Sequence, residues 1–204
     1  SKVNFNSMNV TPAASKAIKF NSSNNGLETG DIGGSLVLIS TQTASNSSAI
    51  SFTSGIDSTY KEYIFKCIEM HPVTDGAELT FQVDTGTNTS YNQTITSTFF
   101  RAYHQESGTD AAVTYQTSYD LAQSTNFQTL SRDSGNDNDQ CCSGTLHLFD
   151  PSNSTFVKHF MATFNTTTQD NQQHNSYASG YVNTTTALTR VRFKFHSGNI
   201  DAGT

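Results

Sequence analysis

Four cationic or titratable side chains alternate along one segment near the end of the chain: Arg190, Arg192, Lys194 and His196. A spacing of two residues places all four on one face of a β-strand, opposite Val191, Phe193 and Phe195. The stripe stands out because the formal net charge of the chain is −6. It is typical of an outward sheet face balanced by acidic residues on neighbouring strands, or of a patch that meets an acidic face of another subunit. We therefore treat these four residues as a candidate interface patch.

The loop 133–139 has the oxygen chemistry of a calcium site, with three carboxylates and two amides in seven residues. It lacks the sixth-position glycine and the terminal bidentate glutamate of a helix-loop-helix calcium site. The six His and three Cys show none of the close spacings that place two ligands on one side of a metal ion. We expect no cofactor, and calcium binding by this loop stays open beside a solvated acidic loop.

Residues for covalent or acid–base catalysis are not arranged in any pattern that we could identify. The chain has no GxSxG turn, no flanking signature around its cysteines and no Gly-rich nucleotide loop. Acidic residues such as Glu62, Glu69, Glu78 and Asp84 are present, but no spacing links two of them into a pair for glycoside cleavage. The sequence therefore predicts a protein that is not an enzyme, and a depolymerase is only a third alternative.

The three cysteines are Cys67, Cys141 and Cys142. Neighbouring cysteines rarely bridge each other, because a disulfide needs Cα and Cβ separations that consecutive residues reach only with strain. We expect all three cysteines to be free thiols, in a protein that is made in a reducing cytosol. A bridge from Cys67 to Cys141 or to Cys142 is the alternative.

Composition narrows the class of protein further. Ser, Thr, Asn and Gln occupy 85 of the 204 positions, whereas charged residues make up only 14%. Helical bundles need the Ala, Glu, Lys, Arg and Leu that are scarce here, and disordered tails lack so many Phe and Tyr. Only 11 Lys and Arg are spread over the chain, which argues against nucleic-acid binding. Leu36–Ile39 is too short to span a membrane, and no signal-peptide layout begins the sequence.

Short apolar segments separated by Gly, Asn or Asp turns recur from Ser35 onward, which is the rhythm of an all-β protein. We predict an antiparallel, jelly-roll-like β-sandwich over residues 35–204. The expected strands are 35–41, 49–54, 61–71, 77–84, 91–104, 111–121, 125–131, 141–149, 156–166, 174–184 and 188–197. In the strand 77–84, Leu79, Phe81 and Val83 share the inward face. We expect Ser, Thr, Asn and Gln to occupy the outward half of each strand.

Residues 1–34 differ from the rest, because they show no sustained period of two or 3.6 and end in a Gly-rich stretch. Such a segment cannot build a core of its own. Its scattered apolar residues suggest that it lies against this domain or a neighbouring subunit. We interpret it as an extended N-terminal arm for anchoring and assembly, with Phe5, Val10, Ile18 and Phe20 as the candidate contact residues.

Three segments in the C-terminal half carry a resemblance to a known class of proteins. They are Cys142–Pro151 (CSGTLHLFDP), Thr155–Phe160 (TFVKHF) and Val191–Thr204 (VRFKFHSGNIDAGT). In these segments the chain resembles uncharacterised virion proteins of marine tailed bacteriophages, from about Gly33 onward. Such proteins usually continue past the Gly-Thr with one more short apolar strand. The resemblance therefore implies that a last strand is missing here, which leaves the pairing of the strand 188–197 open.

The resemblance implies a non-enzymatic structural component of a tailed-phage virion, made in the host bacterial cytoplasm and exposed on the particle as capsid decoration or with the tail. Its partners would be other virion proteins and copies of itself, as a trimer by analogy. The alternative is a receptor- or carbohydrate-binding module of a tail fibre that recognises a host surface glycan. Its exposed stacking residues would be Tyr91, Tyr103, Tyr115, Tyr119, Tyr177 and Tyr181.

Overall fold

The computed structural model describes residues 16–31 and 36–204, and every regular element in them is a β-strand. Contacts divide the chain into two compact units, residues 1–39 and residues 40–204. The predicted boundary at residue 34 falls slightly earlier than this division. Phe5 and Val10 of the candidate arm lie outside the described residues.

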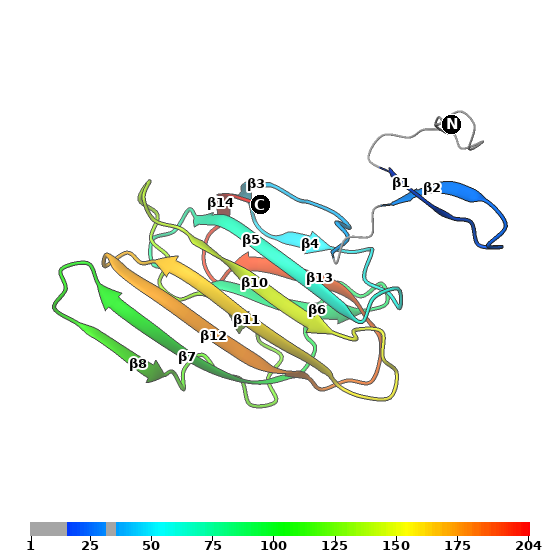
Figure 1. The fold of residues 1–204 in the computed structure, drawn as a ribbon. Helices are drawn as coiled ribbons and strands as arrows, with labels where there is room; N and C mark the ends of the chain where they lie inside the picture. Colours follow the sequence, from blue (N-terminus) through cyan, green and yellow to red (C-terminus); the bar gives the residue numbers. More distant parts are fainter. Residues whose placement is uncertain (1–15, 32–35) are drawn as a thin grey trace, which may run out of the picture. The chain divides into compact units, whose positions relative to one another are not determined.

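The described residues form fourteen β-strands, most of which are labelled in Figure 1. Their bounds are β1 Lys16–Phe20, β2 Leu27–Asp31, β3 Ala44–Ser47, β4 Ile50–Phe52, β5 Glu62–Pro72, β6 Leu79–Thr85, β7 Ile95–Gln105, β8 Ala111–Tyr115, β9 Gln128–Thr129, β10 Cys142–Phe149, β11 Lys158–Thr167, β12 Gln172–Val182, β13 Leu188–Phe195 and β14 Ile200–Gly203.

The second unit is an antiparallel β-sandwich, as the sequence predicted. One sheet has eight strands in the order β3-β14-β5-β10-β11-β12-β7-β8, and the other has four in the order β4-β13-β6-β9. All the strand pairs in both sheets are antiparallel. Consecutive strands β10, β11 and β12 lie side by side in the larger sheet (Figure 1). The jelly-roll connection pattern itself stays a prediction.

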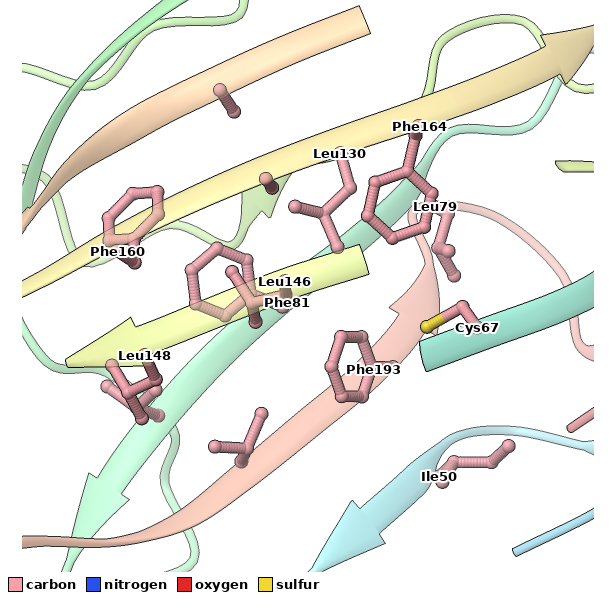
Figure 2. Packing of buried hydrophobic residues seen from close by; sticks show 14 of the residues in the cluster. Ile50, Cys67, Leu79, Phe81, Leu130, Leu146, Leu148, Phe160, Phe164 and Phe193 are labelled. Carbon is pink, nitrogen blue, oxygen red and sulfur yellow. The ribbon is translucent and has the colours of Figure 1, made fainter. Parts of the chain in front are cut away.

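Alternation of apolar and polar residues places a Phe-rich core between the two sheets. On β11, Phe160, Ala162 and Phe164 are buried while Met161 and Thr163 between them are exposed. On β6, Phe81 meets the edge of Phe160 at 5.0 Å between ring centroids and approaches Phe193 of β13 at 6.4 Å. Figure 2 shows these rings gathered with Leu146 and Leu148 of β10. Burial of these side chains supplies the main stabilisation of the sandwich.

The C-terminal residues complete the larger sheet. β14 lies between β3 and β5, and the strand β13 before it pairs with β4 on one side and β6 on the other. In this structure the segment 188–197, whose pairing the resemblance had left open, therefore has a partner strand on each side. β3 and β14 were not among the expected strands, because their short polar sequences carry no apolar alternation.

Several predicted strands were wrong in extent or in kind. Residues 36–41 form no strand, although the run Leu36–Ile39 is the most apolar in the chain, and its side chains are exposed. The segment 111–121 is a strand only to Tyr115, and 125–131 only over Gln128–Thr129. Apolar character alone indicates a strand only where a partner strand can pair with it.

The first unit contains a β-hairpin inside the segment that we predicted to be an arm without regular structure. β1 and β2 pair from Lys16↔Asp31 to Phe20↔Leu27, and an ion pair of 3.4 Å joins Lys19 to Glu28. Ile18 and Phe20 lie on the same face as Leu27 and are 39% and 70% exposed. The hairpin therefore presents an uncovered apolar face that includes two of the candidate arm residues.

Candidate binding surface

One half of the eight-stranded sheet, made of β11, β12, β7 and β8, has an outer face without charged side chains. Its residues are the ones that alternate with the core positions along β7, β8, β11 and β12. No Asp, Glu, Lys or Arg stands at these outward positions of the four strands. They carry hydroxyl, amide, imidazole, aromatic and small apolar side chains instead. Ser, Thr, Asn and Gln hold many of the outward positions on β7, β11 and β12, but the outward positions of β8 are Ala111, Val113 and Tyr115, so the expectation of a polar outward half is met only in part.

An aromatic row crosses this face from strand to strand. Phe100 of β7 pairs in register with Tyr177 of β12 and with Tyr115 of the edge strand β8. The rings of Phe100 and Tyr177 are stacked, with centroids 4.8 Å apart and planes at 10°. Phe100 and Tyr115 are 41% and 54% exposed. Exposed stacked rings of this kind offer flat apolar contact to a ligand or partner.

Hydrogen bonds hold the phenol groups near this row in place. The Tyr115 hydroxyl donates to Asp120 Oδ2 at 2.5 Å, and this contact raises the pKa of Tyr115. Asn175 Nδ2 donates to the Tyr177 hydroxyl at 2.8 Å. Further along β12, Gln123 Nε2 donates to the Tyr181 hydroxyl at 3.2 Å. The hydroxyl group of each of these three tyrosines therefore has a fixed hydrogen-bond partner. Such an arrangement suits a surface that combines ring stacking with hydrogen bonding.

An open hollow of about 570 Å³ lies at the corner of this face, where the connection from β10 to β11 turns back. It is lined by Phe149, Phe156, His159 and neighbouring polar residues. The His159 ring lies 6.2 Å from the ring of Tyr181 of β12.

The six tyrosines predicted to be exposed separate into two groups. Tyr115, Tyr177 and Tyr181 lie on the outer face. The expectation was wrong for Tyr91, which is buried. Tyr119, which packs against Phe99 of the core, and Tyr103, on the inner face of β7 beside His174, are half-buried, as Tyr177 and Tyr181 also are. Sequence reasoning missed Phe100, although it alternates with the core residue Phe99 on a strand that was correctly placed.

The candidate interface patch lies on β13 with the predicted alternation. Val191, Phe193 and Phe195 are in the core and the cationic side chains are on the other face. The Arg192 guanidinium lies 3.9 Å from the centroid of the Tyr91 ring, and its Nε donates to Ser51 Oγ at 2.9 Å.

The remaining members of the patch also have partners within the sandwich. Arg190 Nε donates to the Gly86 carbonyl, Lys194 Nζ lies over the Phe127 ring, and His196 Nδ1 accepts from the Glu78 amide. Within residues 16–31 and 36–204 none of the four is in an ion pair. Asp84 lies directly opposite Arg190 in the register of β6 and β13 but forms no ion pair with it, and the patch stays a prediction as an interface.

The polar face of β6 is not open to solvent as we predicted. Thr80, Gln82 and Asp84 are 3%, 0% and 0% exposed. Gln82 Nε2 donates to the carbonyls of Gln93, Thr125 and Asn126, and Asp84 accepts from the Tyr91 amide at 2.8 Å. Loops therefore cover this part of the smaller sheet, which leaves the eight-stranded sheet as the larger open face.

A buried group of titratable side chains lies on the inner face of β7 and β12. His174 is 1% exposed, and both of its ring nitrogens lie within hydrogen-bond distance of Arg101 Nη1, while Nε2 is also 2.9 Å from Gln172 Oε1. Burial, and then the nearby Arg101 and Arg132, lower the pKa of His174 to about 3. The ring is therefore neutral at pH 7, and its unprotonated nitrogen can accept a hydrogen bond from the guanidinium.

Two further groups complete this buried cluster. Arg132 Nε donates to Asp133 Oδ2 and to the Tyr119 hydroxyl, each at 2.9 Å. Burial raises the pKa of Asp133, although Arg132 and Arg101 oppose that shift. Sequence reasoning missed Arg101 and His174. The sequence signal that could have placed Arg101 was its spacing. Arg101 follows Ile95, Ser97 and Phe99 at intervals of two residues and so belongs to the inward face of the strand.

The cysteines and the acidic loop can also be placed. All three cysteines are free, and burial raises the pKa of Cys142 to about 11 and that of Cys67 even further. In the loop 133–139, Asp133 pairs with Arg132, while Asn136 Nδ2 donates to the Val73 carbonyl. Among the described residues, no three His, Cys, Asp or Glu side chains are grouped to hold a metal ion.

Comparisons with family models, with curated proteins and with solved structures found no match to this chain. In the part of the chain that the structure covers, no helix is long and apolar enough to cross a membrane.

Proposed function

We propose that the chain is a non-enzymatic structural component of a tailed-phage virion, displayed on the particle surface as capsid decoration or with the tail. The neutral outer face of β7, β8, β11 and β12 carries the proposal. A broad surface without formal charge avoids nonspecific attraction to polyelectrolytes, and its hydroxyl and amide groups keep it hydrated. The resemblance of the C-terminal half to phage virion proteins supports the same reading.

Attachment to the particle is assigned to residues 1–34. The hairpin β1–β2 supports this role, because a two-stranded ribbon is only marginally stable alone and its face with Ile18, Phe20 and Leu27 is uncovered. Contact with a neighbouring virion protein or with another copy of the chain would bury that face. Association as a trimer remains part of the proposal by analogy only.

Deleting residues 1–39 is expected to abolish incorporation into particles while the sandwich keeps its melting temperature. The sandwich draws its core from both sheets of residues 40–204, so its stability does not depend on the hairpin. Particles produced with the truncated chain are purified and assayed by mass spectrometry, and melting is followed by circular dichroism. Phe20→Ser should lower incorporation and Lys19→Ser, on the opposite face of β1, should not. Normal incorporation of the truncated chain would contradict the anchoring role.

The second candidate is a receptor- or carbohydrate-binding module, which the row of Tyr115, Phe100 and Tyr177 favours. Sugar rings have apolar C–H faces that pack on aromatic planes, while their hydroxyls need amide, hydroxyl or carboxylate partners. The outer face supplies both within one row, with Asn175 and Asp120 as the polar neighbours. A subtomogram average of labelled particles would separate the two candidates: even distribution over the capsid supports decoration, and a position at the tail tip supports receptor binding.

Under this second candidate, Tyr177→Ala is expected to weaken binding of the strongest ligand on a glycan array about tenfold. Loss of one stacked ring removes about 1 kcal/mol of aromatic contact, together with its apolar area. Met161→Ala removes another exposed apolar side chain from the same sheet face and is the matched control. Absence of binding to any glycan by the unmodified chain, or equal binding by Tyr177→Ala, would remove the carbohydrate-binding candidate.

A further inference from the structure

Three buried hydrogen-bond donors without partners gather in one part of the sandwich. In the described residues, four buried side-chain polar atoms have no hydrogen-bond partner: Arg101 Nε, Thr166 Oγ1, Ser176 Oγ and Tyr91 Oη. The first three belong to the inner face of the eight-stranded sheet, whereas Tyr91 lies at the smaller sheet beneath Arg192. Unsatisfied buried polar groups are uncommon in native proteins, so three in one place need a physical explanation.

Strand register brings these three donors around His174. Ser176 pairs directly with Arg101 across β12 and β7, and Thr166 pairs directly with His174 across β11 and β12. Thr166 and Ser176 are diagonal neighbours, a relation that puts their Cα atoms about 7–8 Å apart. Thr166 is fully buried and Ser176 is 1% exposed. One small ligand on the inner face of these strands can therefore receive hydrogen bonds from several of the donors.

The charge of the cluster determines what kind of ligand fits. Arg101 and Arg132 supply two positive charges, Asp133 and the nearby Asp170 supply negative charge, and His174 is neutral at pH 7. Asp133 is held by Arg132, and none of the ion pairs among the described residues includes Arg101. The Nε–H of Arg101 is therefore a cationic donor without a partner in a buried position, where an unpaired donor is costly.

We propose that this cluster binds one small inorganic anion, such as chloride, on the inner face of the sheet over β11, β12 and β7. Arg101 Nε–H and the hydroxyls of Ser176 and Thr166 donate to it, while the guanidinium supplies the opposite charge. A metal cation does not fit, because the Nε–H of Arg101 can only donate and the two guanidinium groups repel a cation. The site is independent of the proposed function, because it uses the inner face of the sheet and not its outer face.

Bromide is the probe for a crystallographic test, because its anomalous signal separates it from water. Crystals of the full chain grown or soaked in sodium bromide should show one anomalous peak within hydrogen-bond distance of Arg101 Nε. The same crystals of Arg101→Gln should lack it. Electron density beside the donors that gives no anomalous signal, in crystals where bromide is bound at other places, would mean that water satisfies the donors. That result would overturn the proposal.

Thermal unfolding tests the same site in solution and does not require crystals. At constant ionic strength, replacing gluconate by chloride should raise Tm by about 3 °C and the rise should saturate, because a ligand that binds only the folded state stabilises it. Ser176→Ala should melt normally in gluconate, since the deleted hydroxyl has no partner, and should lose most of the chloride response. Ser179→Ala, on the outer face of the same strand, should retain it. An equal response in all three proteins would refute the site.

Discussion

Phe81→Ala is expected to reduce the free energy of unfolding by about 4 kcal/mol, which corresponds to a fall of about 10 °C in Tm. Phe81 is completely buried, meets Phe160 of the opposite sheet at 5.0 Å and approaches Phe193 of the neighbouring strand at 6.4 Å. Removing its ring takes away the apolar burial and leaves a cavity between two sheets that cannot close freely. Urea unfolding followed by fluorescence and circular dichroism measures the loss.

Phe100→Ala is the matched control for this prediction. It deletes the same side chain from a position that is 41% exposed on the outer face. We expect a loss below about 1 kcal/mol, because half-exposed rings bury less area and leave no enclosed cavity. Similar losses for the two variants would mean that the core does not depend on the contact between the sheets that Phe81 makes.

Acidification is expected to destabilise the sandwich between about pH 6.5 and pH 3 through His174. Its pKa is lowered to about 3 in the folded state by burial and by the two arginines, whereas an unfolded histidine titrates near 6.5. The contribution of His174 is therefore complete above pH 6.5 and is lost as the pH falls, because the unfolded chain binds the proton first. The slope is at most about 1.4 kcal/mol per pH unit for one proton.

Variants separate this effect from the rest of the acid titration. His174→Gln keeps a polar side chain and should flatten the dependence of Tm on pH between pH 6 and pH 4, whereas His104→Gln, exposed on the outer side of β7, should leave it unchanged. Asp133 acts with the opposite sign, because its pKa is raised in the folded state and its protonation favours folding. Parallel curves for unmodified chain and His174→Gln would show that His174 is not buried as a neutral ring.

Alternation was the reliable signal in this sequence. Phe160, Ala162 and Phe164, and likewise Val191, Phe193 and Phe195, are inward residues as their spacing of two predicted. The same rule would have placed Arg101 inward, but a charged residue at a core position runs against the expectation that polar side chains face solvent. Its inward position became clear only from the neighbouring strand, where His174 and Ser176 are buried beside it.

Long-range pairing and loop cover could not be predicted. β14 pairs with β3, which is more than 150 residues earlier in the chain, and neither strand has an apolar pattern of its own. Gln82 alternates with core residues and was predicted to face solvent, yet loop carbonyls from residues 93, 125 and 126 enclose its amide. Loop cover also explains why some of the predicted tyrosines are buried and others are not. Tyr91 lies in one of those loops, whereas Tyr115 and Tyr177 are on strands.

The row formed by Tyr115, Phe100 and Tyr177 runs across strands instead of along one of them. Its spacing is therefore fixed by the hydrogen bonds of the sheet, which keep neighbouring strands about 4.8 Å apart. No loop has to be ordered when a molecule contacts the row, so little conformational entropy is lost on contact. Where many copies of the chain are displayed together, a weak interaction of each copy can then be sufficient for binding. After one copy has bound, the contacts of its neighbours become intramolecular, which raises the overall affinity.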